Sequence, residues 1–425
     1  MSTTPVSPDV LVAALSTRDL TDPAQGPHAL QILVEEAVRA LTRDGMQVRL
    51  ERSRPVVPVQ DNYDLLGYAK DAVARDARYT RYVSDTCVLR GHTSAGIPSA
   101  LRRLAADADA PAAVLLVLPG ICHRRDAIDR LHSGTPHQLD LWLLRRGGRR
   151  LDRSDLADMV SRLLAAVLPG GHWRWTAAEH PYTVGGRQID VVDEGRPVEI
   201  AECGLAAPHV LSNAGVDAER WSGLALGMGL DRVLMLRTGV PDIRLLRSTD
   251  PRVSDQMLDL APYRPVSDLP PARRDVSVAV TAGADAETLG DRVRETLGPD
   301  ADLVEEITVL STTPYAALPG PARDRLGIRP GQDNVLLRIV LRPTDRTLTA
   351  GQANALRDRI YDALHEGAAG SSGTRVTRTS SPGESSSSVA AAPPLTAIAM
   401  WPTESTNTTR SPAATSPNVE ASTTA

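Results

Sequence analysis

Phenylalanine is absent from this chain of 425 residues, and lysine occurs once, at Lys70. Arginine, alanine, glycine and proline are abundant, a skew that indicates a GC-rich coding sequence. Codon bias alone is an incomplete explanation, because isoleucine, asparagine and tyrosine persist. A core without phenylalanine must be filled by Leu, Val, Tyr and Trp, and drift towards that composition is the simplest interpretation.

Cysteine and long apolar runs are scarce as well. The three cysteines, Cys87, Cys122 and Cys203, have no paired spacing, which excludes a disulfide scaffold and predicts buried thiols in a reducing compartment. No run approaches about 20 apolar residues, and the N-terminus lacks the pattern of a signal peptide. We therefore expect a cytoplasmic protein with no membrane partner.

The charge is nearly balanced. With 47 basic and 52 acidic residues, the net charge is −5, so the chain is not a generally basic nucleic-acid coat. This balance gives no support to a DNA partner, and any RNA contact must use a local basic patch.

The first 260 residues suggest an extension followed by a mixed domain. Residues 1–50 carry an amphipathic helix at Ala29–Thr42, whose apolar face suits either core packing or docking in a homodimer. Residues 51–260 mix short strands with helices at Ala95–Ala106 and Asp152–Leu168. Since no βαβ repeat is visible, we predict an α+β fold with an antiparallel sheet flanked by helices.

The remaining residues suggest a second domain and a tail. Residues 261–367 read as strand, helix, strand, strand and helix, a ferredoxin-like order without its last strand. The predicted elements are Asp275–Val280, Ala286–Leu297, Leu303–Leu310, Asn334–Arg342 and Gln352–His365. Residues 368–425 are rich in Ser, Thr, Ala and Pro, cannot bury a core, and are predicted to be disordered.

A glycine-rich stretch from Gly223 to Arg232 is the most informative local pattern. It predicts an apolar strand, a glycine turn and a helix over Val233–Arg237. Arg232 then lies at the start of a helix, where a cation opposes the helix dipole unless an anion lies between them. A phosphate shared by Arg232 and the helix N–H groups is one interpretation, and a solvated arginine in a turn is the other.

A second pattern runs from Gly120 to Asp140. Read as a hairpin, it places Arg124 and Asp126 on one face of one strand, and Gln138 and Asp140 on the same face of the returning strand. An arginine suits a phosphate and the acceptors suit an ammonium group. A polar surface hairpin is the plainer interpretation, while the histidine spacing in this segment matches no compact zinc site.

Together the two patterns resemble motifs 2 and 3 of class II aminoacyl-tRNA synthetases, and in detail the catalytic subunit of phenylalanyl-tRNA synthetases. The resemblance covers roughly residues 50–365. Its cues are Arg124-Arg125-Asp126, Asp129, His132, His137-Gln138, Glu199, Cys203-Gly204, Gly227-Met228-Gly229-Leu230-Asp231-Arg232, Pro241-Asp242-Ile243-Arg244, Asp61-Asn62-Tyr63-Asp64, Leu89-Arg90-Gly91-His92-Thr93-Ser94-Ala95, Tyr263-Arg264-Pro265-Val266-Ser267 and Arg273-Arg274-Asp275.

The resemblance implies ATP and Mg²⁺ as cofactors and assigns residues to each ligand. Arg124 would meet the α-phosphate of ATP, where charge builds during attack by the amino-acid carboxylate, and Arg232 would hold the γ-phosphate end. Glu199 would contact Mg²⁺, although its segment also alternates like an ordinary strand. The other implied ATP-binding residues are Asp126, His132 and His137.

The implied amino-acid site departs from the family pattern. His92, Ser94, Gln138 and Asp140 match the positions that hold the amino and carboxylate groups, with Asp140 in place of the family's Glu. The ring pocket, where the family has Phe-Pro-Phe-Thr, contains His180-Pro181-Tyr182-Thr183, with Ala225 as a small floor residue and Glu202 where Gly is usual. Buried imidazole and hydroxyl groups need partners, so a hydroxylated or otherwise polar aromatic substrate fits this pocket as well as phenylalanine does.

The resemblance therefore implies an enzyme that activates an aromatic amino acid, with phenylalanine expected, and transfers it to tRNA. Its phosphate patch for tRNA would be Arg264, Arg273 and Arg274 in the ferredoxin-like anticodon-binding domain; a solvated strand edge with an Arg–Asp pair to Asp275 is the alternative. An activating paralogue outside translation and a non-catalytic tRNA-binding regulator are the competing functions. An enzyme that charges phenylalanine but contains none could still be synthesised when phenylalanine-charged tRNA runs out. Selection therefore competes with drift as the explanation for the absence of phenylalanine.

Overall fold

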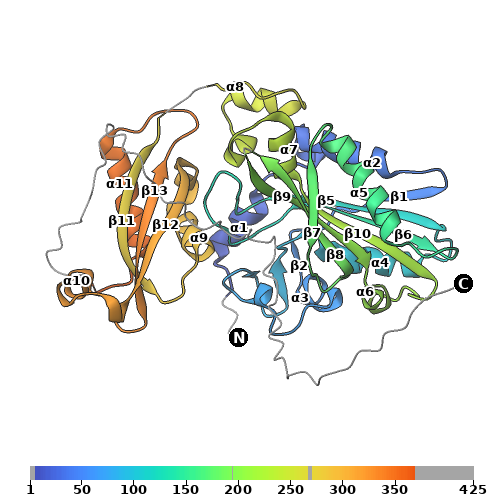
Figure 1. Ribbon diagram of the computed structural model, residues 1–425, viewed down its shortest axis with the longest axis horizontal. Coiled ribbons are helices and arrows are strands. Elements are labelled where there is room, and N and C mark those ends of the chain that lie inside the picture. The colour runs from blue at the N-terminus through green and yellow to red at the C-terminus, as the bar shows by residue number, and fades with distance from the viewer. Residues whose placement is uncertain (1–4, 194, 267–269, 369–425) are drawn as a thin grey trace, which may run out of the picture.

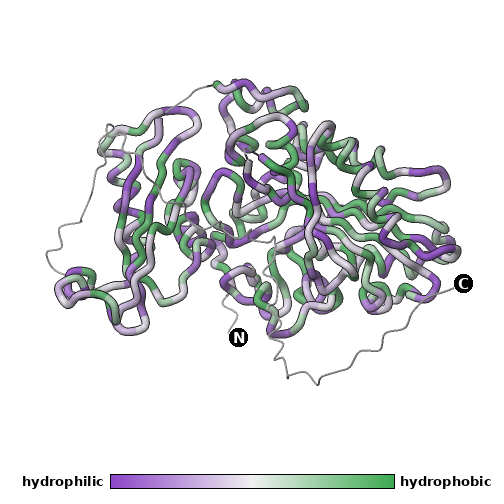
Figure 2. Tube along the Cα trace, in the orientation of Figure 1, coloured by the Kyte–Doolittle hydropathy of each residue, from purple (hydrophilic) through white to green (hydrophobic). Residues whose placement is uncertain are grey.

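The computed structural model describes residues 5–193, 195–266 and 270–368 (Figure 1). The tail predicted to be disordered lies outside these residues, apart from Ala368, and so does Ser267. Among the helices in this described part, none is long and apolar enough to cross a membrane. Figure 2 shows apolar stretches gathered in the strands and in the helices packed on them.

A seven-stranded sheet forms the larger unit, in the order β1-β5-β6-β10-β9-β8-β7. All neighbouring strands are antiparallel except β1 and β5, which are parallel, so the predicted antiparallel sheet needs this one correction. The strands are β1 (Met46–Leu50), β5 (Ala113–Ile121), β6 (His137–Arg146), β7 (Trp173–Ala177), β8 (Thr183–Asp193), β9 (Arg196–Ala206) and β10 (Trp221–Gly229).

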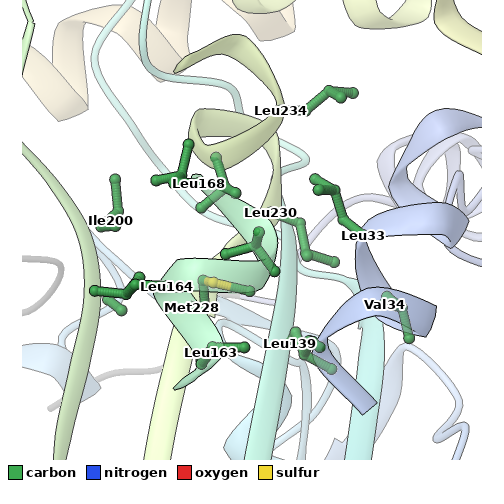
Figure 3. Close-up of a cluster of buried hydrophobic side chains, with 14 of the residues drawn as sticks. Leu33, Val34, Leu139, Leu163, Leu164, Leu168, Ile200, Met228, Leu230 and Leu234 are labelled. Carbon is green, nitrogen blue, oxygen red and sulfur yellow. The ribbon is translucent and has the colours of Figure 1, made fainter. Parts of the chain in front are cut away.

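Three helices cover one face of this sheet: α2 (Ala29–Leu41), α5 (Arg153–Val167) and α7 (Leu230–Thr238). Figure 3 shows Leu33 of α2, Leu164 of α5 and other side chains meeting over the strands. The apolar face of α2 is thus buried in the protein's own core, which confirms core packing as its role. Residues 29–50 contribute α2 and β1 to this same unit.

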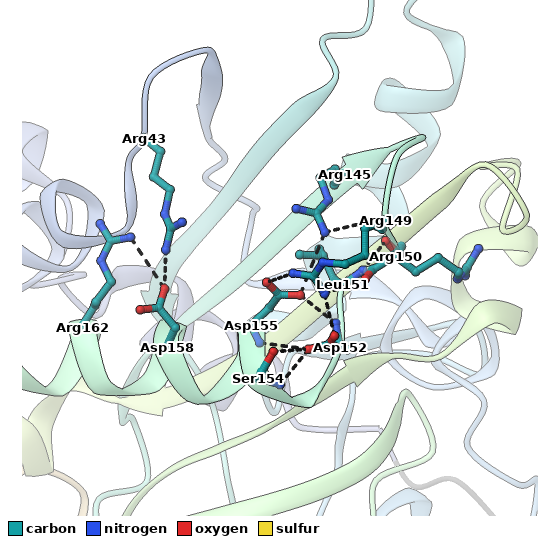
Figure 4. Close-up of polar contacts among 11 residues, drawn as sticks. Arg43, Arg145, Arg149, Arg150, Leu151, Asp152, Ser154, Asp155, Asp158 and Arg162 are labelled. Carbon is teal, nitrogen blue, oxygen red and sulfur yellow. Dashed lines mark hydrogen bonds and ion pairs between the residues drawn. The ribbon is translucent and has the colours of Figure 1, made fainter.

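Helix α5 shows how local sequence fixes an element. The Asp152 carboxylate accepts hydrogen bonds from the N–H groups of Ser154 and Asp155, and the Asp155 carboxylate accepts one from the N–H of Asp152 (Figure 4). This reciprocal cap satisfies backbone donors that the first helical turn leaves open. Arg149 forms ion pairs with both carboxylates. The helix begins directly after its cap residue Asp152, which confirms the predicted start.

The opposite face of the sheet is covered at one end by short elements, which share a second apolar cluster with Trp142 and Tyr182. The other end of this face carries the polar residues described below. The covering elements are the helices α3 (Val59–Asn62), α4 (Ile97–Ala106) and α6 (Pro208–Asn213), with the small sheet β2 (Val56–Pro58), β4 (Cys87–Leu89) and β3 (Arg81–Tyr82) nearby. Helices α1 (Pro8–Ser16) and α8 (Pro251–Ser254) complete the unit.

The C-terminal unit has the predicted strand-helix-strand-strand-helix order, with one additional short helix, α10, between its second and third strands. Its sheet order is β11-β13-β12, and α9 and α11 pack on one face. The elements are β11 (Ala272–Thr281), α9 (Ala286–Leu297), β12 (Val304–Pro314), α10 (Gly320–Leu326), β13 (Gln332–Leu341) and α11 (Ala350–Leu364). Among the described residues, no fourth strand joins β11, although the N–H of Glu366 donates to the carbonyl of Ala279 at 2.7 Å.

The two units meet at the loop between β5 and β6. Ile128 of this loop belongs to the apolar core of the C-terminal unit, and its carbonyl accepts a hydrogen bond from the N–H of Ile307 at 3.0 Å. Arg294 of α9 donates to the carbonyls of Asp126 and Ala127. Asp291, which is 0% exposed, pairs with two arginines of the larger unit, Arg81 and Arg125.

Candidate active site

One face of the large sheet carries a row of polar side chains. Asp140 of β6 lies opposite Gly227 of β10, which in turn lies opposite Glu202 of β9. Residues directly opposite each other on neighbouring strands point to the same face of a sheet. Asp140 and Glu202 therefore flank the position where Gly227 has no side chain, and both are buried.

Strand β10 forms the floor of this row. Alternate positions that face the row are Gly223, Ala225, Gly227 and Gly229, while Leu224, Leu226 and Met228 enter the core on the other face. A Cβ placed on Gly227 would find only the Asp140 carboxylate, at 3.7 Å. The predicted small floor residue Ala225 lies opposite Trp142 and Gly204. The central strand thus leaves a strip without large side chains.

A β-bulge in β9 brings Glu199 to the same face as Glu202. The two residues are three positions apart and would point to opposite faces of a regular strand. The register shifts between Ile189 and Asp190 of β8, and both Ile200 and Ala201 enter the core. The extra residue of the bulge reverses the alternation. The sequence of this segment reads as a regular alternating strand, but the bulge places both Glu199 and Glu202 on one face of the sheet.

Asp140 is the centre of a buried hydrogen-bond network. Its carboxylate accepts from the hydroxyls of Thr93, at 2.7 Å, and Ser94, at 3.1 Å, and from the Trp142 indole N–H at 3.4 Å. Burial raises the pKa of Asp140 to about 6, although these hydrogen bonds oppose the rise. Above that pH the group is a carboxylate suited to an ammonium ion.

The residues beside this network hold it in place. The Gln138 side-chain oxygen accepts from the N–H of Thr93 at 3.3 Å and from the Cys122 thiol at 3.4 Å. His92 contacts the carbonyl of Asn62 at 3.1 Å, and its ring lies 6.2 Å from that of Tyr68. Burial, with a smaller effect from the charge of Arg124, lowers the pKa of His92 to about 3, so its imidazole is neutral at physiological pH.

Aromatic residues and one ion pair lie at the far end of the row. The Tyr182 ring stacks on Trp142 with centroids 6.5 Å apart and lies 6.3 Å from Tyr68. His180, also predicted for this pocket, pairs through Nε2 with the Glu202 carboxylate at 2.8 Å. The three predicted ring-pocket residues Ala225, His180 and Tyr182 are thus grouped at one end of the row, next to Asp140, which was predicted to hold the amino or carboxylate group.

The other end of the row is built on the loop between β5 and β6. A small pocket there is lined by six of the predicted residues: Arg124, Asp126, His132, His137, Gln138 and Arg232. Arg124 is anchored by a hydrogen bond from its Nε to the carbonyl of Gly91 at 2.7 Å. Arg232 donates from Nη1 to the carbonyl of Glu199 at 3.0 Å. Both cations are therefore held by backbone carbonyls.

Two histidines at this end have acidic partners. His132 contacts Asp129 through Nδ1 at 2.7 Å; burial alone would raise the pKa of Asp129, but the hydrogen bond and charge of His132 lower it below its usual value. His137 contacts Asp231 through Nδ1 at 2.8 Å, and its Nε2 accepts from the N–H of Leu20 and from Arg247. Both ring nitrogens of His137 are therefore occupied by protein groups, although the residue lines the pocket.

The predicted hairpin needs a correction. Strand β5 ends at Ile121 and β6 begins at His137, so Arg124 and Asp126 lie on a long loop. Alternation along a strand therefore does not set the direction of their side chains. The loop is fixed by the C-terminal unit, by Arg90 and by Gly120, where a Cβ would approach the Arg90 guanidinium to 2.0 Å. Gln138 and Asp140 do share a strand face as predicted.

The acidic side chains of the row offer few ligands for a metal ion. In the part of the chain that the structure describes, no group of three or more His, Cys, Asp and Glu side chains is arranged to hold an ion. Glu199 is buried beside Asp190 on the neighbouring strand. This fits a Mg²⁺ ion that arrives on substrate phosphates, since such ions take only one or two protein carboxylates.

The predicted tRNA patch is not assembled in one place. Arg273 and Arg274 are consecutive in β11 and so point to opposite faces of its sheet. Arg274 donates from Nε to the Asn354 side chain of α11 at 2.8 Å, while Arg273 and Arg264 are exposed. Asp275 pairs with Arg338 of β13, which differs from the sequence alternative of a pair with a neighbouring arginine.

The sequence interpretation missed several residues that the fold places at the site. Thr93 and Trp142 donate to Asp140, and Tyr68 forms part of the aromatic wall. Thr93 stands between two predicted residues, His92 and Ser94, and was therefore within reach of the motif. Nothing in the local sequence marks Tyr68 or Trp142.

Comparison with known proteins agrees with this geometry. Residues 18–257 match the model described as the class II core domain of tRNA synthetases (F). The chain is 35% identical to a phenylalanine–tRNA ligase alpha subunit of Prochlorococcus marinus (strain MIT 9313), over 58% of this chain and 74% of that one. It is 25% identical to the mitochondrial phenylalanine–tRNA ligase of Saccharomyces cerevisiae, over 73% of this chain and 80% of that one.

Among solved structures, the chain resembles PylSc, a pyrrolysyl tRNA synthetase of Desulfitobacterium hafniense. The identity is 19% and the TM-score 0.39, over 56% of this chain and 77% of that one. The matched core domain spans more than half of the present chain and contains the whole polar row. The chain therefore belongs to the family of class II tRNA synthetase core domains and is an aminoacyl-tRNA ligase.

Proposed function

We propose that the protein activates an aromatic amino acid with ATP and transfers it to tRNA, as a phenylalanine–tRNA ligase would. The observation that carries this proposal is the shared sheet face, on which the Asp140 network and the aromatic wall adjoin the pocket of Arg124 and Arg232. The names of the relatives point to phenylalanine as the reference substrate. Residues 51–260 would form the main part of the catalytic domain, to which residues 29–50 add α2 and β1, and residues 261–367 would be the anticodon-binding domain.

The first reaction is a displacement at the α-phosphate. A carboxylate oxygen of the amino acid forms a bond to phosphorus while the bond to the bridging oxygen of pyrophosphate breaks, so an aminoacyl adenylate and pyrophosphate result. Arg124 stabilises the charge that develops on the α-phosphate, and Arg232 holds the leaving phosphates. Asp140 and Gln138 orient the amino group, and Glu199 would hold Mg²⁺, which neutralises phosphate charge when bound.

The test is ATP–pyrophosphate exchange with the purified full-length chain. Exchange dependent on an aromatic amino acid is expected, and Arg232→Ala should abolish it, since the anchored guanidinium has no substitute at the start of α7. Charging of total tRNA then tests the second step. Pyrophosphate exchange that persists unchanged in Arg232→Ala contradicts the site assignment. Charging of tRNA that is unchanged in Arg264→Ala and Arg273→Ala contradicts the role of these two arginines in binding tRNA.

A second candidate is an activating paralogue that serves a process outside translation. The specific observation that favours it is the His180–Glu202 pair in the ring pocket. Exchange without charging of any tRNA would support this candidate. A cytoplasmic location is part of either proposal and rests on three unpaired cysteine thiols within the described residues.

A further inference from the structure

The buried carboxylate of Glu202 has an unsatisfied oxygen. Its Oε1 pairs with His180 Nε2 at 2.8 Å, and both side chains are 4% exposed. Its Oε2 is buried and has no hydrogen-bond partner within the described ranges. A buried acceptor without a donor is unfavourable, so such a group in a native protein calls for a partner.

Glu202 lies on the sheet face that carries the candidate amino-acid site. Glu202 lies on the face shared with Asp140, separated from it by Gly227. Burial raises the pKa of the Tyr182 hydroxyl, and the nearby Tyr68, Glu202 and Asp140 raise it further. The ring of Tyr182 lies 5.5 Å from that of His180, the partner of Glu202, and stacks on Trp142 with centroids 6.5 Å apart.

A second unsatisfied atom lies beside the same ion pair. The hydroxyl of Thr183 is buried and has no hydrogen-bond partner among the residues described. Thr183 is close to the site face, since a Cβ on Gly204 would approach its Cβ to 2.6 Å. A Cβ on Gly186 would lie 3.2 Å from the Thr183 hydroxyl and 3.3 Å from His180 Nδ1. Thr183, His180 and Glu202 thus form one polar cluster at the ring end of the site.

We propose that this cluster binds a hydroxyl group on the ring of an aromatic amino acid, and that the enzyme prefers such a ring-hydroxylated substrate to phenylalanine. Glu202 Oε2 accepts the hydrogen of the substrate hydroxyl, and the Thr183 hydroxyl donates to its oxygen. The walls of Trp142 and Tyr182 suit a ring, and a hydroxyl is the smallest donor that leaves the ring planar and stackable. The inference rests on the proposed function, because it names the substrate class of the same site.

This arrangement also predicts the direction of discrimination. A site built to hydrogen-bond a substrate hydroxyl rejects the analogue that lacks it, because its own buried polar groups then remain unpaired. Phenylalanine would leave both Glu202 Oε2 and Thr183 Oγ1 unsatisfied. Three hydrogen-bond donors already hold the Asp140 carboxylate, which would bind the amino group at the other end of the substrate. The preference therefore arises at the ring end alone.

The experiment is ATP–pyrophosphate exchange by the full-length protein with phenylalanine, meta-tyrosine and para-tyrosine. We expect kcat/KM for one tyrosine isomer to exceed that for phenylalanine at least tenfold, a threshold set well below the roughly 10⁴–10⁵-fold discrimination of sites that require a substrate hydroxyl. Glu202→Met should reduce this ratio at least tenfold. The double variant His180→Leu/Glu202→Met, which removes both partners, should do the same while improving use of phenylalanine. Glu35→Met on the exposed face of α2 is the matched control and should leave the ratio unchanged.

Each outcome decides one question. A wild-type preference for phenylalanine, with a ratio that the Glu202 variants do not alter, overturns the inference and leaves the proposed function intact. Absence of exchange with all three amino acids contradicts the proposed function itself. If the variants fail to fold, the wild-type Tm decides: a larger rise with a tyrosine isomer than with phenylalanine supports the inference, and an equal or smaller rise overturns it.

Discussion

The two ends of the polar row are built in different ways. At the nucleotide end, Arg124 and Arg232 lie on a loop and at a helix start, and each is anchored by backbone carbonyls. At the amino-acid end, Asp140 and Glu202 lie on strands and are held by other side chains. Carbonyl anchors fix a guanidinium without neutralising it, which preserves charge for a phosphate. A network of side chains instead fixes the positions of the hydrogen-bonding groups, so that the site selects a ligand by its polar groups and its size.

The two ends also differ in where their support comes from. The amino-acid end is supported within the large sheet. The loop of the nucleotide end depends on the C-terminal unit, through Arg294, Ile307 and the buried Asp291. Substitutions at the two ends should therefore affect different substrates, and four predictions test that separation.

The largest effect is expected at the nucleotide end. Arg124→Ala should lower kcat for pyrophosphate exchange by about 10²–10³-fold, which is typical for loss of one group that stabilises transition-state charge. The KM for the amino acid should change little, because Asp140 is untouched. Arg346→Ala, which removes an exposed arginine paired with Asp345, is the control. A kcat within threefold of the wild type would show that Arg124 does not meet the reacting phosphate.

Removal of the interface carboxylate comes next. Asp291→Ala removes the buried carboxylate from Arg81, which keeps only the longer contact with Glu295, and from the half-buried Arg125, and should reduce the free energy of unfolding by about 3 kcal/mol. Urea denaturation measures this change. Asp345→Ala, an exposed control, should stay within about 0.5 kcal/mol of the wild type. The KM for ATP should rise more than that for the amino acid, and the reverse order would contradict loop support by the C-terminal unit.

The pH dependence of amino-acid binding separates the two ends further. The pKa of Asp140 is raised to about 6, so the carboxylate that attracts an ammonium group is present above pH 6 and is lost below it. The Kd of the amino acid should rise about tenfold per unit as pH falls below 6, whereas that of ATP should not follow this curve. Isothermal titration from pH 5 to 8 measures both.

The same shift has a consequence for stability. Since the folded protein holds the Asp140 proton at a pH where the unfolded chain has released it, this group lowers stability as pH rises from about 4 to 6. Asp140→Asn should remove both pH effects. Persistence of the binding curve in Asp140→Asn would assign it to another group.

The smallest effects concern the floor of the row. In Gly227→Ala, the new Cβ meets only the Asp140 carboxylate at 3.7 Å, so stability should change by less than about 0.5 kcal/mol while the KM of the amino acid rises several-fold. In Gly204→Ala, the Cβ would approach that of Thr183 to 2.6 Å, and stability should fall by about 1–3 kcal/mol. Equal loss of stability in both variants would contradict an open strip at Gly227.

The sequence by itself determined the elements and most of the site residues. The periodicity of Leu30, Leu33 and Ala37 predicted α2, and the predicted helix over Asp152–Leu168 matches α5. Motifs around Arg124 and Arg232 placed the chain in its family. These features depend on local spacing, which a chain carries whatever its tertiary contacts.

Only the tertiary structure decided which side chains meet. The bulge at Ile200 places Glu199 beside Glu202, and the strand register places Gly227 between Asp140 and Glu202. The loop bearing Arg124 takes its position from a helix more than 160 residues later in the chain. The same strand pairing directs Arg273 and Arg274 to opposite faces. Register, bulges and docking arise from contacts between distant segments, and no local pattern in the sequence specifies them.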